Sequence, residues 1–233
     1  MNLLPQKIIE LNSVAMTFGN GYTPLKNVNI TINRGDFVAI TGPNGGGKTT
    51  LLKLILQLLK PTEGNISYSW NGQEVNKLNM GYLPQKTTID NKFPITVEDV
   101  VLSGLDCTNR FFYKTTSKDK AAIEKALKLV GLEDYRNHGI GQISGGQLQR
   151  ALFARVIVCK HDVLVFDEPL SYIDKVFEDR LYDIIRDLAR ESTIILVSHE
   201  MTTISQMANR HIIIDGTLHE CHASHHFIRT ECE

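Results

Sequence analysis

Short apolar runs and helical periodicities alternate in the first and last thirds of the chain. Four runs of the type found in buried parallel strands are residues 36–41, 163–166, 194–197 and 211–214. Between the second and third of these runs, apolar residues recur at i, i+3, i+4 and i+7 from Leu181 to Leu188, which predicts a helix. Strands that alternate with helices indicate an α/β protein built on a parallel sheet.

Two further elements follow the first predicted strand. Residues 48–59 are apolar nearly all round, which predicts a buried helix ended by Pro61 and Gly64. Residues 66–70 alternate between apolar and polar positions, and Asn71-Gly72 is a strong two-residue turn signal. This hairpin is expected to belong to an antiparallel flap.

The middle of the chain, from Lys86 to about Val158, has a different pattern. Helical periodicity dominates in this region, and the β-branched runs typical of strands return only after it. Thr116 and Asp119 have the spacing of a capping box, and Gly131 suits the end of the helix that follows. The sequence therefore predicts a helical insert within the α/β fold.

Composition excludes several classes of protein. The 233 residues are 42% hydrophobic and 22% charged, which is typical of a globular domain. With 25 Lys and Arg against 26 Asp and Glu, the chain has no bulk basic field for nucleic acid. The N-terminus lacks a signal-peptide pattern, and the most apolar stretch, residues 51–59, is too short to cross a membrane. The four cysteines, Cys107, Cys159, Cys221 and Cys232, do not make a disulfide framework. We therefore expect the protein to be in a reducing cytosol.

A phosphate-binding loop is the first chemical motif. Residues 42–49 (GPNGGGKT) match GxxxxGK[ST] between a predicted strand and a predicted helix. Glycines let backbone N–H groups converge on the β- and γ-phosphates, and the helix N-terminus adds partial positive charge. Lys48 is expected to reach the outer phosphates, and the Thr49 hydroxyl to ligate Mg²⁺. The expected nucleotide-binding residues here are Gly42, Pro43, Asn44, Gly45, Gly46, Gly47, Lys48, Thr49 and Thr50.

Two acids follow the strand at residues 163–166. Asp167 ends this apolar run, where a carboxylate of a phosphate-loop enzyme holds Mg²⁺. Glu168 comes next and can polarise a water aligned with the γ-phosphate. The carboxyl end of a buried strand is where α/β sheets bind ligands, which favours these roles over two solvated loop acids.

Residues 143–147 (ISGGQ) distinguish between families of phosphate-loop proteins. They precede a helix predicted from Leu148 onward, so their N–H groups can form a second anion site. One chain cannot easily direct two such sites at one γ-phosphate, whereas two chains arranged head to tail can. In this respect the sequence resembles the ATP-binding subunit of ABC transporters, whose signature is LSGGQ.

This resemblance covers essentially the whole chain and implies roles for further residues. It implies that Phe18 stacks on adenine and that Gln85 senses Mg²⁺ and the attacking water. Asp174 lies in a segment that resembles the D-loop, and His199 resembles the switch histidine that contacts the γ-phosphate. Gly46 stands where Ser or Ala is usual, which is expected to loosen the loop. The residues implied to bind the nucleotide of a second copy are Ser144, Gly145, Gly146 and Gln147.

The resemblance also implies an architecture and a set of partners. The fold is a RecA-like P-loop core over residues 1–86 and 159–218, with an antiparallel flap and a helical signature subdomain over residues 87–158. Two copies sandwich two ATP molecules with Mg²⁺, and hydrolysis resets the dimer. The implied partners are integral membrane permease subunits at the cytoplasmic face of the cell membrane and, indirectly, an extracytoplasmic substrate-binding protein.

The cargo is suggested by two segments and by the C-terminus. Residues 93–104 and 177–185 resemble importers of zinc, manganese or iron, although relatives for siderophores, haem or amino acids share parts of this pattern. The last segment, residues 219–233, is expected to be a His/Cys-rich tail, which is either solvated or a Zn²⁺ sensor that inhibits the ATPase. Its candidate ligands are His219, Cys221, His222, His225, His226 and Cys232.

Three other classes of protein fit the sequence less well. A soluble GTPase or kinase does not account for ISGGQ, and neither 76–79 nor 91–94 completes a guanine-reading NKxD. ABC ATPases of DNA repair or translation carry long inserts or two ATPase domains, for which this chain is too short. A nucleotide-gated scaffold without turnover does not need Glu168 and His199.

Overall fold

The computed structural model describes residues 5–85, 89–90, 92–105, 115–170, 173, 175–198, 204 and 206–221. The strands of an antiparallel sheet, ordered β2-β1-β4-β5, are β1 (Lys7–Met16), β2 (Leu25–Asn33), β4 (Glu63–Trp70) and β5 (Gln73–Val75). The strands of a second sheet, ordered β10-β9-β3-β8-β7-β6, are β3 (Phe37–Thr41), β6 (Met80–Leu83), β7 (Val163–Asp167), β8 (Thr193–Val197), β9 (Arg210–Asp215) and β10 (Thr217–Cys221).

The helices are α1 (Lys48–Ile55), α2 (Val97–Leu102), α3 (Ser117–Val130), α4 (Gly145–Ile157) and α5 (Lys175–Leu188), with 3-10 turns η2 (Glu133–Tyr135) and η3 (Ile140–Gln142). In the second sheet β6, β7, β8, β3 and β9 run parallel, and β10 pairs antiparallel with β9. The predicted α/β fold with an antiparallel flap and a helical insert is confirmed.

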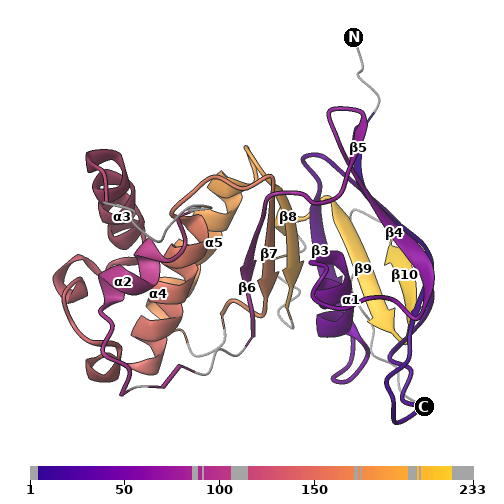
Figure 1. The fold of residues 1–233 in the computed structure, drawn as a ribbon, viewed down its shortest axis with the longest axis horizontal. Coiled ribbons are helices and arrows are strands. Elements are labelled where there is room, and N and C mark those ends of the chain that lie inside the picture. The colour runs from indigo at the N-terminus through magenta and orange to yellow at the C-terminus, as the bar shows by residue number, and fades with distance from the viewer. Residues whose placement is uncertain are drawn as a thin grey trace.

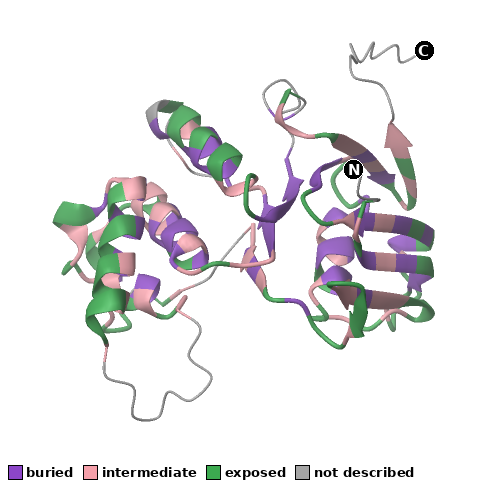
Figure 2. Cartoon of the chain, turned by 90° about the horizontal axis from the view of Figure 1, so that it is seen from above, coloured by how far each residue is buried: buried purple, intermediate pink, exposed green. Residues whose placement is uncertain are grey.

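The central strands separate two hydrophobic cores. Phe37 and Ala39 of β3 pack with helices α2 to α5, whereas Val38 and Ile40 pack with α1 and the antiparallel sheet. The strands β7 and β8 divide their residues between the same two cores, as expected when successive side chains point to opposite faces. Consequently α2 to α5 lie on one side of the sheet, with α2 and α3 packed on α4, and α1 lies on the other side (Figure 1). Figure 2 shows the buried residues along the central strands and on the inward sides of the helices.

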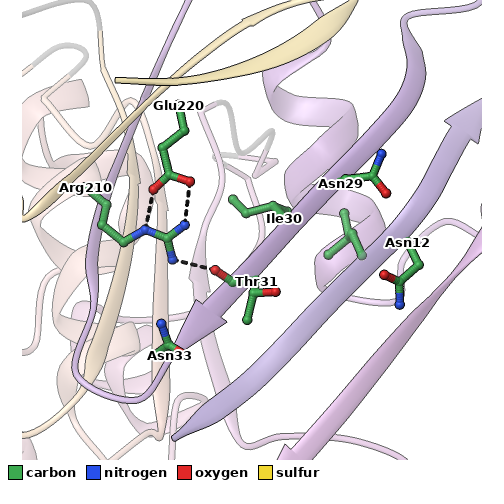
Figure 3. Close-up of a pocket in the computed structure, with 8 residues that line it drawn as sticks. Asn12, Asn29, Ile30, Thr31, Asn33, Arg210 and Glu220 are labelled. Atoms are coloured by element: carbon green, nitrogen blue, oxygen red, sulfur yellow. Dashed lines mark hydrogen bonds and ion pairs between the residues drawn. The ribbon is translucent and has the colours of Figure 1, made fainter. Parts of the chain in front are cut away.

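Arg210 links the two sheets through charged and polar contacts. Its guanidinium donates to both carboxylate oxygens of Glu220 on β10, at 2.6 and 2.8 Å, and to Asp36 at 2.8 Å. It also donates to the backbone carbonyl of Thr31 on β2 (Figure 3). Arg210, Glu220 and Thr31 line a hollow between the sheets, and the Arg210 guanidinium there already has hydrogen-bond partners within the chain.

Several local predictions are confirmed. Asn71 and Gly72 have φ angles of 51° and 78°, as a type I′ hairpin turn requires, and β4 pairs antiparallel with β5. The capping box of Thr116 and Asp119 begins α3, and Gly131 ends it with φ 63°.

The predicted helix over residues 48–59 is too long, because α1 ends at Ile55. Gln57 has φ 59°, in the left-handed region, and its side chain donates to the Asn76 carbonyl at 2.7 Å. The leucine run continues beyond this break, with Leu58 60% exposed. Hydrophobic periodicity could not reveal this break, since the left-handed residue is neither glycine nor asparagine.

Two other boundaries differ from the prediction. The helix predicted from Leu148 begins at Gly145, so the small residues of ISGGQ form its cap and first turn. The expected tail from residue 219 begins inside β10, where His219 pairs with Ile213 and Cys221 with His211. Within the described ranges, no helix combines the length and apolar character that a membrane span requires.

Candidate functional site

The carboxyl ends of β3, β7 and β6, with β8 between β3 and β7, bring predicted site residues to one edge of the sheet. These strands are parallel, and their registers pair Leu83 with Phe166, Asp167 with Val197, and Ile40 with Val197. The phosphate loop follows β3, Gln85 follows β6, and Glu168 follows β7. Parallel strands thus position residues that lie far apart in the sequence side by side.

Glycine is required at two positions of the phosphate loop by the closeness of its neighbours. A Cβ on Gly42 would lie 2.0 Å from the backbone oxygen of Ile214, and one on Gly47 would lie 2.5 Å from that of Pro24. Both also have positive φ, 139° and 102°. The loop backbone is therefore held against β9 and the segment before β2.

The Lys48 side chain reaches back across the phosphate loop to its first residues. Its ammonium donates to the carbonyls of Gly42 at 2.8 Å and Pro43 at 2.9 Å, and the residue is only 7% exposed. These carbonyls keep the ammonium at the centre of the loop without neutralising it. An incoming phosphate can therefore bind a cation that is already positioned.

The start of α1 differs from those of the other helices whose caps are described. Capping boxes begin α2, α3 and α4, through Thr96, Thr116 and Ser144. At α1 the N-cap is Gly47, with no side-chain hydrogen bond and no acid in the first turn. The N–H groups that other helices satisfy internally are available here to an anion.

Thr49 and Asp167 meet as a cation site requires. The Thr49 hydroxyl donates to Oδ2 of Asp167 at 2.9 Å, across 118 residues of sequence. Asp167 is 1% exposed, and burial raises the pKa of its carboxyl while the Thr49 hydrogen bond opposes the shift. Oδ1 is buried and has no hydrogen-bond partner within the described part of the chain. A buried carboxylate oxygen without a partner, beside a hydroxyl, fits Mg²⁺ or its bound water.

Glu168 is held in an unusual backbone conformation. Its φ is 52°, and its N–H donates to the carbonyl of Val197 at 2.9 Å, so the chain turns sharply as it leaves β7. The Gln85 amide donates to Oε2 of Glu168 at 2.6 Å. A carboxylate and an amide in contact at this edge can together position and polarise a water molecule.

Phe18 lies beside an aromatic residue that the sequence analysis did not single out. The rings of Phe18 and Tyr22 are nearly parallel, with centroids 6.3 Å apart and planes inclined by 7°. The Tyr22 hydroxyl donates to the carbonyl of Gly45 at 2.7 Å, and the residue is 49% exposed. Tyr22 thereby connects the candidate base-stacking residue to the phosphate loop. The available sequence signal was a second aromatic residue four positions after Phe18.

The turn between β9 and β10 supports the loop from behind. The N–H of Gly216 donates to the carbonyl of Gly46 at 3.1 Å, and a Cβ on Gly46 would lie 2.7 Å from the oxygen of Ile214. Nothing in the local sequence around residues 214–216 indicated this contact.

The second predicted anion site lies apart from the first. Ser144 caps α4, accepting from the N–H of Gln147 at 3.2 Å, while the N–H of Ser144 donates to the Gln147 side chain at 2.8 Å. Ser144 and Gly145 are exposed. The helices that begin at the two motifs, α4 and α1, pack on opposite faces of the sheet. The Ser144 hydroxyl keeps its own proton to donate to an anion.

Other predicted site residues fall outside the described residues. They are Asp174, His199, His222, His225, His226 and Cys232. His219 and Cys221 lie on β10, and the His219 ring is 3.2 Å from the Thr217 hydroxyl. Among the residues that the structure describes, no three His, Cys, Asp or Glu side chains are grouped to hold a metal ion.

Comparison with known proteins agrees with this geometry. The family model described as "ABC transporter" matches residues 25–171. The zinc uptake system ATP-binding protein ZurA of Listeria innocua is 37% identical over 225 residues, covering 92% of this chain and 87% of its own. The manganese transport system ATP-binding protein MntA of Synechocystis is 33% identical over 213 residues, covering 90% and 82%.

A solved structure extends the likeness to three dimensions. A dimeric ATP-binding cassette in a post-hydrolysis state, bound to ADP and Pi, has a TM-score of 0.78 and 27% identity, covering 91% of this chain and 97% of its own. The phosphate loop, the Thr49–Asp167 pair and the ISGGQ cap of α4 are parts of the same fold that the comparisons identify. The chain is therefore a member of the ABC transporter family, as an ATP-binding subunit with ATP hydrolase activity.

Proposed function

We propose that this chain hydrolyses ATP to drive the import of a metal ion, with zinc as the cargo. The observation that carries the proposal is the likeness to the ATP-binding protein of a zinc uptake system, at 37% identity over 92% of the chain. An ATPase subunit does not touch the cargo, so the assignment rests on likeness over the whole chain rather than on a cargo-binding side chain. Manganese is the second candidate, favoured by the 33% identity with a manganese transport protein.

Each side chain at the sheet edge has a proposed task. The phosphate loop and Lys48 bind the β- and γ-phosphates, and Phe18 stacks on the adenine. Thr49 and Asp167 hold Mg²⁺, which supplies positive charge to the phosphate oxygens when it is bound. Glu168 polarises the attacking water. Gln85, whose amide donates to the Glu168 carboxylate at 2.6 Å, positions the carboxylate and the water.

The second anion site is proposed to act on another molecule's nucleotide. Ser144 to Gln147 are exposed or half-buried, on the face of the sheet away from α1, so they suit a partner's γ-phosphate better than their own. A related cassette is dimeric when bound to ADP and Pi. ATP would hold two such chains head to tail, because its γ-phosphate binds both motifs at once.

The proposed partners follow from the family. Membrane permease subunits provide the translocation path, and the helical insert entered through Gln85 transmits dimer closure to them. The chain accordingly acts at the cytoplasmic face of the cell membrane, and an extracytoplasmic substrate-binding protein delivers the metal to the permease. Residues 219–233 are also proposed to sense Zn²⁺. Since His219 and Cys221 belong to β10, a truncation that tests this idea must end after Cys221.

The metal content of cells tests the proposed cargo. A strain whose only copy carries Glu168→Gln is compared with wild type in metal-poor medium, and zinc, manganese and iron are measured. Glu191→Gln makes the same chemical change at an exposed position and serves as the matched control. We expect a selective fall in zinc with Glu168→Gln and none with Glu191→Gln. A selective fall in manganese supports the second candidate, and unchanged metal levels overturn both.

A further inference from the structure

A cysteine, a histidine and an asparagine meet at the edge of the sheet opposite the nucleotide site. Asn79 precedes β6, His161 precedes β7, and Cys159 follows α4, so all three lie at the amino ends of the strands. The Cys159 sulfur is 3.3 Å from Nε2 of His161, and Nδ1 of His161 is 2.9 Å from Oδ1 of Asn79. None of these residues takes part in the proposed ATP chemistry.

The hydrogen bonds around Asn79 define the protonation of the imidazole. Nδ2 of Asn79 donates to the carbonyl of Lys160 at 3.0 Å, which leaves Oδ1 facing His161. An amide oxygen only accepts, so Nδ1 of His161 carries a proton. In the neutral ring Nε2 is then the basic nitrogen, and it faces the thiol.

The ring is also restrained by its neighbours. A Cβ on Gly81 of β6 would lie 2.7 Å from Cδ2 of the His161 ring, so the ring occupies the space left by that glycine. The Ser192 hydroxyl donates to the His161 carbonyl at 2.7 Å and anchors the backbone. A base held by a third group beside a thiol is the arrangement that activates a cysteine nucleophile.

The Gly104 carbonyl and the His161 imidazole both contact the Cys159 sulfur, but they differ in whether they can take its proton. The Gly104 carbonyl lies 3.3 Å from the Cys159 sulfur and can accept a hydrogen bond, but a backbone carbonyl cannot hold the proton. The His161 imidazole can. Charged side chains on the segments that meet here are Lys77, Arg155, Lys160, Asp162 and Glu191, and Lys160 is paired with Glu191 at 2.8 Å.

We propose that Cys159 is a reactive thiol, activated by His161 and Asn79, and a site of mixed-disulfide formation with low-molecular-weight disulfides. The thiol proton passes to Nε2 of His161, and the sulfur attacks one sulfur of R–S–S–R. A new S–S bond forms as the reagent's S–S bond breaks, and the leaving thiolate takes the proton from the imidazolium. Cys159 and R–S–S–R thereby become Cys159–S–S–R and R–SH, with the disulfide as the oxidant.

The test uses the full chain with one thiol. Cys107, Cys221 and Cys232 are changed to serine, leaving Cys159, and His161→Gln and Asn79→Ala are made in that background. Alkylation by iodoacetamide is followed by intact mass from pH 5.5 to 9.5, and glutathione disulfide probes the exchange itself. Cys159→Ser is the blank, and cooperative thermal unfolding shows that each variant is folded.

We expect the single-thiol protein to react at pH 6.5 about tenfold faster than its His161→Gln variant, with Asn79→Ala between them. An ordinary thiol is only about 1% thiolate at that pH, and all rates converge near pH 9.5. Glutathione disulfide should add one glutathione to Cys159. The pH profile of the single-thiol protein decides the matter even if His161→Gln does not fold. A profile with the midpoint of an ordinary thiol, near pH 8.5, or no reaction at Cys159, overturns the proposal.

Discussion

Asp167 shows a conflict between stability and function at a single residue. Its carboxyl is 1% exposed, and one oxygen lacks a hydrogen-bond partner within the described residues. Burial raises the pKa of this carboxyl, which means that the folded chain binds the proton more tightly than the unfolded chain does. The charged form is therefore a destabilising feature of the fold when no cation is bound.

Asp167→Asn should separate the two effects. The amide keeps an oxygen for the Thr49 hydroxyl and removes the buried charge, so the nucleotide-free variant should melt higher than wild type at neutral pH. For a chain of this size each 1 kcal/mol corresponds to about 2–4 °C. The gain should shrink as the pH falls below the raised pKa, where the wild-type carboxyl is protonated too.

The same variant should lose the stabilisation that ATP with Mg²⁺ gives to wild type. Thermal unfolding is measured over a range of pH values with and without ATP–Mg²⁺, and with ATP plus EDTA as the control. A variant that melts lower than wild type without nucleotide, or that is still stabilised by ATP–Mg²⁺ as wild type is, would contradict this account of Asp167.

Residues in motifs of fixed spacing were predictable, and residues that act through tertiary contacts were not. Lys48, Thr49 and Asp167 follow predicted strands or loops directly, so their meeting at one sheet edge could be inferred from the rule that parallel sheets bind ligands at the carboxyl ends of their strands. Tyr22 contacts Gly45 across 23 residues of loop and strand, which no periodicity encodes. The left-handed backbone of Glu168 is likewise set by its bond to Val197 on the neighbouring strand.

At the scale of elements, two capping boxes provide an internal comparison. Ser144 begins α4 and Thr116 begins α3, and both accept from the backbone N–H three residues on, at 3.2 and 3.3 Å. Ser144→Ala and Thr116→Ala should therefore each lower the free energy of unfolding by about 1 kcal/mol. Only the first removes a proposed ligand of the γ-phosphate.

ATP hydrolysis should distinguish the two alanine variants. Ser144→Ala should lose most of its steady-state rate, whereas Thr116→Ala should keep a rate near that of wild type at a temperature where both are folded. Denaturant unfolding establishes that the stability losses match. Equal loss of activity in the two variants would show that the Ser144 hydroxyl acts only as a helix cap.

Gly46 should tolerate a side chain poorly, although the family usually has Ser or Ala there. A Cβ would lie 2.7 Å from the oxygen of Ile214 and 3.1 Å from that of Pro43. Gly46→Ser should therefore destabilise the protein by about 1–3 kcal/mol, as overpacking does. Gly19→Ala is the control, because nothing lies within 4 Å of its added Cβ. Gly46 was expected to loosen the loop, but the close contact of its backbone with Ile214 and Gly216 holds the loop in place. Equal chemical-denaturation midpoints for the two variants would refute this.

Elements were predicted where local signals agree with the fold. The capping box of Thr116 and the Asn71-Gly72 turn are complete within a few residues, and both are observed. The end of α1 at Ile55 depends on Gln57, whose side chain reaches Asn76, and β10 depends on pairing with β9. Such boundaries are decided by partners far along the chain, so a linear pattern places them less well.

At the scale of the whole molecule, the sheet determines how a complete site can be assembled. The phosphate loop begins α1 on one face, and the ISGGQ segment begins α4 on the other. One chain thus presents the two halves of a site at separate places on its surface. Two chains related by a twofold axis would bring each phosphate loop to the other chain's ISGGQ segment, as a closed isologous dimer.

Mixing two inactive variants tests this arrangement. Lys48→Ala disables the phosphate loop, and Gly145→Asp places a negative charge in the ISGGQ segment, where an added Cβ meets nothing within 4 Å. An acid in the first turn of α4 is also compatible with the helix, so this variant should fold. Each variant alone has the same defect in both of its sites. A mixed dimer instead joins the intact loop of one chain to the intact ISGGQ segment of the other, and ATP hydrolysis should reappear on mixing.

The matched control replaces the Gly145→Asp partner by the double variant Lys48→Ala/Gly145→Asp. Its mixed dimers contain no intact phosphate loop, so they should stay inactive under the same conditions. If hydrolysis in the first mixture remains at the average of the two variants alone, each chain uses its own ISGGQ segment or none. Recovery in the first mixture, and not in the control, requires that a site be made by two chains, because no single polypeptide in the tube carries both working halves.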